Sequence, residues 1–211
     1  MTKVSASILS VNDLDDTIKE LNTLDIDYIH LDIMDGKFVP NTSFTYDQIK
    51  KNIEVSEKPF DVHLMVRDVE DYIYHYAMLN TEYITFHYEV LKDLKIIKKI
   101  KNYGIKCGIS VKPSTDIELI YELLPYIDMV LIMSVEPGRG GQKFIDNSLN
   151  KIKKLKDYIK KNNLNVIISV DGGINNNTGV NCVKNGADML VVGSALINSN
   201  DKENFIKELK S

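Results

Sequence analysis

The sequence predicts an α/β protein whose strands close into a parallel (β/α)₈ barrel. Short apolar segments alternate with amphipathic segments along the chain, giving eight strand-then-helix units at intervals of roughly 25 residues. Buried strands joined by right-handed helical crossovers pair in parallel, and eight such units favour a closed barrel. The chain has 211 residues, 44% of them hydrophobic, and no linker or low-complexity tract. We therefore expect a single domain over residues 1–211.

An open, doubly wound sheet is the alternative architecture. Such a sheet usually carries a glycine-rich fingerprint after its first strand. Ser7, Ile8, Leu9 and Ser10 occupy that place here. The absence of glycine from this stretch favours the barrel.

The predicted strands are short, mostly apolar runs bounded by turn or cap residues. They cover residues 4–9, 28–34, 60–65, 83–87, 106–111, 128–133, 166–170 and 189–192.

Helices are predicted between the strands, where apolar residues recur every three or four positions. Asn12 or Asp13 is expected to cap the first helix, which carries Leu14, Ile18 and Leu21 on one face. The later helices are expected at about 45–53, from 68 onward, at 92–101, 115–124 and 149–159, at about 178–184, and in a last stretch before 209.

The charge and cysteine content limit the partners that we expect. The formal net charge is −4 and the charged residues are dispersed, which gives no reason to expect a nucleic-acid partner. An anionic substrate would need local positive potential from a metal, a helix N-terminus or backbone N–H groups. Cys107 and Cys182 lack CxxC spacing, and no signal-like segment or apolar run of about 20 residues occurs. We therefore expect a cytoplasmic protein with no membrane partner.

Polar side chains are concentrated where the predicted strands end. His30, Asp32 and Met34 alternate with apolar residues, so these three side chains share one face of their strand. Active sites of barrels lie at the C-terminal ends of the strands. The inward polar residues expected there are Ser7, His30, Asp32, His63, His87 and Asp171.

Four of these residues form a candidate metal site. His30, His63, Asp32 and Asp171 offer the mixed nitrogen and oxygen ligands that Zn²⁺, Fe²⁺, Mn²⁺ and Co²⁺ all accept. A structural hydrogen-bonding role is the alternative for any one of them, but burying several charges without a cation is costly. We expect His87 to lie behind the ligands.

The two carboxylates are predicted to face each other. Asp32 and Asp171 come from the second and seventh strands, three positions apart around an eight-stranded ring. This placement suits acid/base chemistry on opposite faces of one carbon.

Glycine-rich loops follow the last three predicted strands. Backbone N–H groups can approach an anion closely at glycine, so these loops are candidates for phosphate binding, although glycines in such loops also serve simply as turn formers. The residues are Gly138, Arg139, Gly140 and Gly141, Gly172 and Gly173, and Gly193 with Ser194. Met34, Met65 and Met133 also stand at strand ends, either as an adaptable wall for a charged intermediate or as ordinary core residues.

These motifs resemble the ribulose-phosphate 3-epimerase family of phosphate-binding (β/α)₈, or TIM, barrels, and the resemblance runs nearly end to end. The most specific segments are HLDIMDGKFVPN at 30–41, DVHLMV at 61–66, VEPGRGGQKF at 135–144 and VDGG at 170–173. The chain departs from the family at three positions, where Ala6 replaces proline, Ser134 replaces threonine and Arg139 replaces phenylalanine.

The resemblance implies an isomerase of the pentose phosphate pathway. By it, His30, Asp32, His63 and Asp171 would hold one divalent metal, with Zn²⁺ expected and Fe²⁺, Mn²⁺ or Co²⁺ as alternatives. Asp32 and Asp171 would epimerise D-ribulose 5-phosphate at C3 through a cis-enediolate to give D-xylulose 5-phosphate.

The resemblance also implies the remaining contacts. Ser7, His63 and Asp171 would touch the sugar, the loop glycines with Ser194 would take up its chain and phosphate, and the three methionines would cover the enediolate. The Arg139 guanidinium would either reach the phosphate or point into solvent. A homo-oligomer is expected.

Three other functions stay open. D-allulose 6-phosphate 3-epimerases have nearly the same motifs, but Gly140, Gly141 and Gln142 favour the pentulose enzyme. Decarboxylases and aldolases of the orotidine-phosphate decarboxylase group carry an Asp-x-Lys-x-x-Asp run, whereas here no lysine stands between Asp32 and Asp35. A non-catalytic phosphate-sensing barrel would not need a second inward carboxylate.

Overall fold

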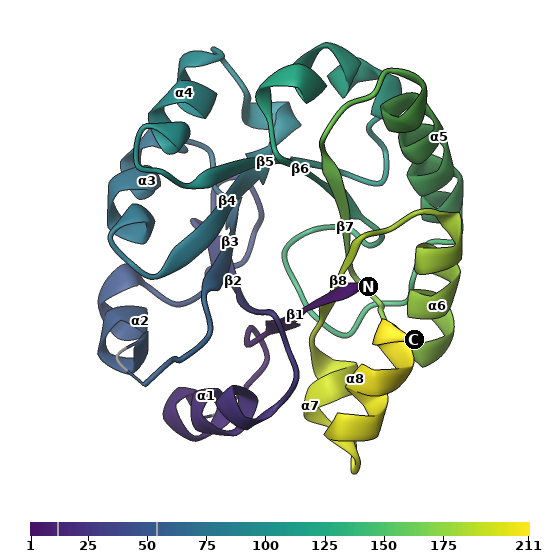
Figure 1. Cartoon of the computed structure of the whole chain (residues 1–211). Helices are drawn as coiled ribbons and strands as arrows, with labels where there is room; N and C mark the ends of the chain where they lie inside the picture. The colour runs from purple at the N-terminus through teal and green to yellow at the C-terminus, as the bar shows by residue number, and fades with distance from the viewer. Residues whose placement is uncertain (12, 54) are drawn as a thin grey trace.

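Eight parallel strands pair in chain order, and the eighth pairs with the first, so the sheet is a closed barrel (Figure 1). This is a computed structural model, and it describes residues 1–11, 13–53 and 55–211. The strands are β1 (Lys3–Ser7), β2 (Tyr28–Met34), β3 (Phe60–Met65), β4 (Thr81–His87), β5 (Lys106–Val111), β6 (Met129–Met133), β7 (Ile167–Asp171) and β8 (Met189–Val192). The predicted (β/α)₈ barrel is confirmed.

The helices form a ring outside the strands, as Figure 1 shows. They are α1 (Leu14–Thr23), α2 (Tyr46–Ile53), α3 (Glu70–Ala77), η1 (Tyr88–Val90), α4 (Lys95–Lys101), η2 (Ile117–Tyr126), α5 (Asn147–Lys161), α6 (Asn176–Asn185), α7 (Ser194–Ile197) and α8 (Lys202–Lys210). None of the helices in the described ranges combines the length and apolar character of a membrane span.

The structure changes several predicted boundaries. β1 ends at Ser7 and not at residue 9, and the helix predicted at 115–124 is the 3₁₀ helix η2 at Ile117–Tyr126. Pro125 lies inside η2, where its missing N–H cannot continue an α-helical hydrogen-bond ladder. The Asp13 carboxylate accepts from Asp16 N and caps α1, whereas the alternative cap, Asn12, lies outside the described residues.

Strand register brings the polar residues into line. In the ladder between β2 and β3, His30 pairs with Asp61, Asp32 with His63, and Met34 with Met65. Because alternate residues face the same side of a strand, these three pairs form three successive rows inside the barrel. The side chains of Tyr28, Tyr83, Met129 and Met189 form an apolar cluster at the opposite ends of the strands.

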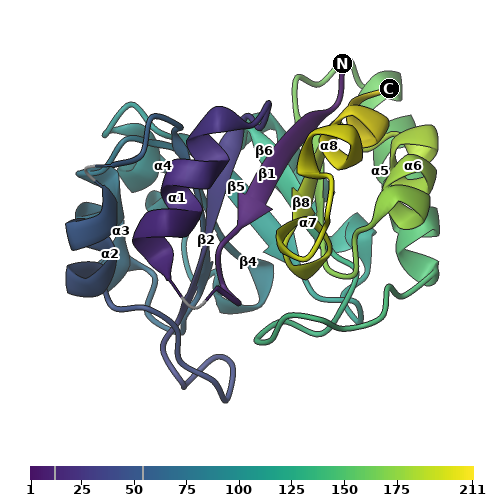
Figure 2. The same cartoon turned by 90° about the horizontal axis from the view of Figure 1, so that it is seen from below.

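The apolar faces of the α-helices cover the outer face of the barrel, and the two termini lie side by side (Figures 1 and 2). Figure 2 shows the loops after β2 and β6 projecting from the end toward which the strands run. Asn41 Nδ2 in the first loop donates to the Gly138 carbonyl in the second over 2.8 Å. This contact joins the two loops above the polar rows.

Candidate active site

A cavity of about 200 Å³ opens at the C-terminal ends of the strands. Its lining includes most of the residues that the sequence predicts for the site. These are Ser7, Met34, Met65, Met133, Asp32, Asp171, Gly138, Arg139, Gly140, Gly141, Gly172, Gly173, Gly193 and Ser194. His30 and His63 are fully buried, and both contact Asp32, which lines the cavity.

The four predicted metal ligands meet at one point. His30, Asp32, His63 and Asp171 each offer one ligand atom, and these atoms all lie within 4.8 Å of one another. Two imidazole nitrogens and two carboxylate oxygens form a donor set that divalent zinc, iron, manganese and cobalt accept.

The orientation of His30 is set by a carboxylate behind it. Its Nδ1 lies 2.8 Å from Asp61 Oδ2, which also accepts from Ser5 Oγ over 3.0 Å. Since a carboxylate only accepts, Nδ1 carries the hydrogen and Nε2 faces the cluster. Nε2 lies 3.3 Å from Asp32 Oδ1, yet it has no hydrogen-bond partner of acceptable geometry among the described residues. An orphaned buried nitrogen aimed at two carboxylates fits a metal ligand.

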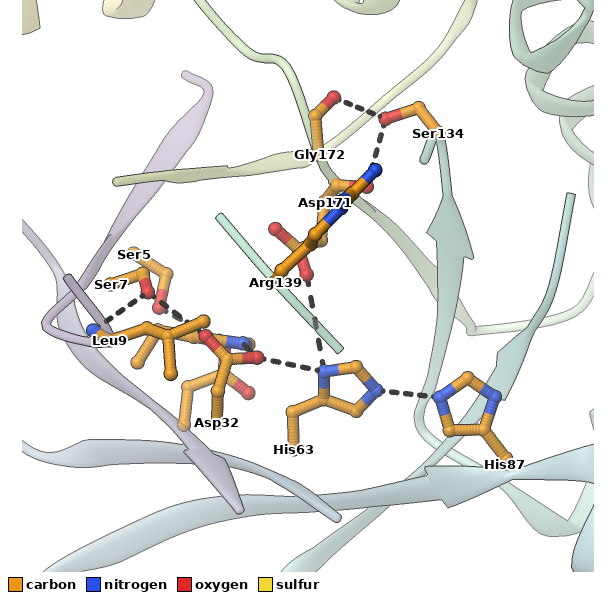
Figure 3. A network of polar contacts seen from close by, with 12 residues as sticks. Ser5, Ser7, Leu9, Asp32, His63, His87, Ser134, Arg139, Asp171 and Gly172 are labelled. Atoms are coloured by element: carbon orange, nitrogen blue, oxygen red, sulfur yellow. Dashed lines mark hydrogen bonds and ion pairs between the residues drawn. The ribbon is translucent and has the colours of Figure 1, made fainter. Parts of the chain in front are cut away.

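His63 approaches the same point from β3 (Figure 3). Its Nδ1 lies 3.2 Å from Asp32 Oδ1 and 3.9 Å from Asp171 Oδ2. Its Nε2 lies 3.0 Å from His87 Nε2, so His87 lies next to His63 on the side away from the two aspartates.

Asp32 is held from both sides. Ser7 Oγ donates to Asp32 Oδ2 over 2.9 Å and accepts from Leu9 N over 3.3 Å, while Oδ1 faces the two imidazoles. Ser7 therefore fixes the carboxylate that lines the cavity.

The environment pushes the pKa values of the two cavity carboxylates in opposite directions. Burial alone raises the pKa of Asp32, but the charges and hydrogen bonds of His30 and His63 outweigh it and hold that pKa well below its usual range. Burial and the Asp32 charge raise the pKa of Asp171 to about 6. Two carboxyl groups with separated pKa values in one cavity can serve as base and acid.

The glycine loops are shaped by close approaches of the backbone. Gly173 has φ +64°, and a Cβ there would lie 2.5 Å from Phe144 N in the loop after β6. Gln142 Nε2 donates to the carbonyls of Glu136 and Arg139 over 2.7 and 2.9 Å, which fixes the turn of that loop. Arg139 is exposed and lines both this cavity and an adjoining one that includes Asn41.

The three methionines belong to apolar clusters that border the cavity. Met34 and Met65 pack with Val39, and Met133 packs with Val135 in a second cluster. They therefore both fill the core and supply the apolar wall of the site.

Several supporting residues did not emerge from the sequence analysis as site residues. Asp61 and Ser5 share inward parity with His63 and Ser7, and this alternation is the signal that could have identified them. Glu89 accepts from His87 and lies in η1, beyond the end of β4, where strand parity no longer applies. Asp35, in contrast, accepts from the backbone N–H groups of the loop after β2 and of Arg67.

Comparison with solved structures supports the fold. The chain superposes on 3-hexulose-6-phosphate synthase from Salmonella typhimurium with a TM-score of 0.71 at 19% identity, covering 99% of this chain and 96% of that one. Phosphoribosylanthranilate isomerase from Thermotoga maritima also gives a TM-score of 0.71, at 14% identity, covering 100% and 99%. At these identities the likeness shows the barrel alone.

Relatives in sequence identify the family, which the fold alone does not. A ribulose-phosphate 3-epimerase from Methanocaldococcus jannaschii is 40% identical over an alignment that covers 100% of this chain and 90% of that protein. One from Bacillus subtilis is 37% identical and covers 100% and 99%. The model of the ribulose-phosphate 3 epimerase family matches residues 3–197, a span that contains all eight strands, the His/Asp cluster and the glycine loops. On this match the chain belongs to the ribulose-phosphate 3 epimerase family.

Proposed function

We propose that this protein epimerises D-ribulose 5-phosphate and D-xylulose 5-phosphate at C3. One observation carries the proposal: Asp32 and Asp171 line one cavity from β2 and β7, with carboxylate oxygens within 4.8 Å of each other. The names of the relatives support the choice of substrate.

The two aspartates exchange a proton with C3 from opposite faces of the sugar. One carboxylate removes the proton to give a cis-enediolate, and the other carboxyl group returns a proton on the far face. In the reverse reaction the roles exchange. Ser7 keeps Asp32 directed into the cavity through the 2.9 Å hydrogen bond to Oδ2.

His30, Asp32, His63 and Asp171 would hold one divalent ion, for which we propose Zn²⁺. When bound there, such an ion supplies Lewis-acid stabilisation of the negative charge that develops on the sugar oxygens. The two imidazoles and the buried setting limit the access of water to this charge.

The loops supply the remaining contacts of the proposed complex. Ser7 and Asp171 line the cavity and contact the sugar, with His63 beside Asp32 completing that end of the site. Met34, Met65 and Met133 cover the enediolate with apolar surface. The backbone around Gly172, Gly173, Gly193 and Ser194 takes up the phosphate, and residues 138–141 close over the sugar chain. Because the overall charge is −4, the positive potential that binds the phosphate must come from local groups such as these backbone N–H groups.

The wider setting follows from the same proposal. We propose a cytoplasmic, single-domain enzyme of the pentose phosphate pathway that assembles as a homo-oligomer and has no nucleic-acid or membrane partner. These points rest on the family and on the dispersed charge.

The test is a substrate assay of the metal-loaded protein in deuterated water. We expect conversion of D-ribulose 5-phosphate, with deuterium incorporated at C3, to be faster than conversion of D-allulose 6-phosphate. Faster conversion of D-allulose 6-phosphate would mean that this hexulose phosphate, and not the pentulose phosphate, is the substrate. Absence of C3 exchange with either sugar would indicate a phosphate-binding barrel without this chemistry.

A further inference from the structure

A chain of hydrogen-bonded side chains runs from the proposed metal ligand His63 away from the cavity. His63 Nε2 lies 3.0 Å from His87 Nε2, and His87 Nδ1 lies 3.1 Å from Glu89 Oε2. His87 comes from β4 and Glu89 from η1. Figure 3 shows the first of these contacts, with His87 on the side of His63 opposite the two aspartates.

Glu89 is held as a carboxylate acceptor at the far end of the chain. Its Oε1 accepts from Lys112 N over 2.9 Å and from Thr115 Oγ1, so its second oxygen is directed to His87. The Glu89 side chain is 22% exposed, whereas those of His63 and His87 are 0% exposed. Water therefore reaches only the carboxylate end of the chain.

The donors and acceptors along this chain can be assigned in order. A carboxylate only accepts, so His87 Nδ1 carries the hydrogen toward Glu89. An uncharged His87 then has its lone pair on Nε2, and His63 Nε2 must donate to it. The lone pair of an uncharged His63 is then on Nδ1, which faces the acceptors Asp32 and Asp171. A divalent ion held there would take the place of the hydrogen that Nδ1 otherwise donates to Asp32 Oδ1 over 3.2 Å.

Neighbouring side chains keep the His87 ring in place. The Phe38 ring lies 4.6 Å from the His87 ring, between centroids, and Lys112 Nζ lies 4.2 Å from the Phe38 centroid. Phe38, in the loop after β2, therefore covers the His87 ring, and Lys112, directly after the end of β5, packs on Phe38.

We propose that Glu89 and His87 are positioning residues that hold His63 as an Nδ1 ligand for the divalent ion. This inference rests on the proposed function, because it assumes the metal site. The Asp61 carboxylate accepts directly from His30 Nδ1 over 2.8 Å, whereas the Glu89 carboxylate acts on His63 through the ring of His87. Carboxylates behind metal-binding imidazoles fix the tautomer and raise the basicity of the ligand nitrogen.

The first test measures metal affinity without any substrate. Wild type and Glu89→Gln are titrated with Co²⁺ in competition with a chromophoric chelator. An amide supplies one acceptor where the carboxylate supplies two, and it carries no charge, so we expect affinity to fall about 10-fold or more. Glu82→Gln is the matched control, because Glu82 lies near the start of β4, at the opposite end of that strand from Glu89, and pairs with Lys106 over 2.6 Å away from the site. We expect wild-type affinity from this control.

The second test reads the tautomers directly. The protein has four histidines, so ¹⁵N spectra of the Zn²⁺-loaded form can be assigned by replacing each in turn. We expect His63 to carry its hydrogen on Nε2 and His87 on Nδ1, a pattern that a merely structural contact does not require. A hydrogen on His63 Nδ1 would overturn the inference.

The outcomes separate the inference from the proposed function. Unchanged Co²⁺ affinity in a folded Glu89→Gln protein that still epimerises its substrate would overturn the inference alone. A wild-type protein that epimerises without binding any divalent ion would overturn the inference and the metal part of the proposed function. A weakened Glu89→Gln site with the expected tautomers supports the inference even if the substrate is a different sugar phosphate.

Discussion

Asp61 Oδ2 lies 2.8 Å from His30 Nδ1, and the two residues pair directly across β2 and β3. We expect Asp61→Asn to lower the affinity for Zn²⁺ or Co²⁺ by about 10- to 100-fold. The amide nitrogen can donate to His30 Nδ1 and so favour the tautomer whose Nε2 hydrogen points at the metal position. Metal affinity by chelator competition is the measurement.

Asp27→Asn is the control for this substitution. Asp27 Oδ2 accepts from Val4 N over 2.9 Å, next to the start of β1 and away from the cavity. We expect this variant to bind metal as the wild type does. Equal affinities for the Asp61 and Asp27 variants would mean that Asp61 serves only the packing of the barrel.

Asp32→Asn and Asp171→Asn test the acid/base pair. Each removes one of the two groups that exchange a proton with C3, so we expect turnover to fall by about 10²- to 10⁴-fold in each. The assay must be made at metal concentrations that saturate each variant, because both residues are also proposed ligands. Full epimerase activity with metal bound, in either variant, would refute the two-aspartate mechanism.

The sequence predicted the residues that line the site better than the residues that hold them in place. Alternation along 28–34 placed His30 and Asp32 on one face, and the order of the strands placed Asp171 opposite them. The register was not predictable, because the pairing of Asp32 with His63 depends on how all eight strands tilt and close. Asp61 follows the same alternation and begins the motif at 61–66, but nothing in the sequence indicated that its side chain supports His30.

Loops and turns limited the prediction elsewhere. Glu89 lies in a 3₁₀ turn, beyond the two-residue period of the strand, so alternation along the strand could not predict that its side chain faces His87. The loop that carries Arg139 is fixed by Asn41, which is 97 residues from Gly138 in sequence. Contacts of this range depend on the finished fold.

Arg139→Phe tests whether the side chain of Arg139 contacts the sugar phosphate. Arg139 is exposed and lines the cavity, so its guanidinium is placed to meet an anionic substrate without supporting the core. We expect an unchanged melting temperature and a Michaelis constant for the sugar phosphate raised several-fold. An unchanged Michaelis constant would argue against contact with the phosphate.

The two thiols are expected to be inert in the folded protein. Cys107 and Cys182 are free and fully buried, and burial raises the pKa of each to about 12. The thiolate is the reactive form, and it is scarce at neutral pH when the pKa is so high. An aromatic disulfide reagent should label neither thiol at pH 8 and both after unfolding. Rapid labelling of the native protein would show that one thiol is accessible.

Gly173→Ala tests whether the loops after β6 and β7 depend on close backbone contact. At Gly173 the φ angle is +64°, and a Cβ would lie 2.5 Å from Phe144 N and 2.8 Å from Phe144 Cα. Alanine therefore meets both a strained backbone conformation and a backbone clash. We expect the free energy of unfolding to fall by about 1–3 kcal/mol, and kcat/KM to fall as the loop after β6 moves away from the cavity.

Gly104→Ala separates these two effects. Gly104 has φ +76°, but a Cβ there would meet no atom of the described residues within 4 Å, and it lies in the turn between α4 and β5. This variant carries the conformational cost of a positive φ without the clash, so it should lose stability while keeping kcat/KM. Chemical denaturation and steady-state kinetics on both variants are the measurements. If Gly173→Ala kept the wild-type kcat/KM, the position of the loop after β6 would not depend on its contact with Gly173.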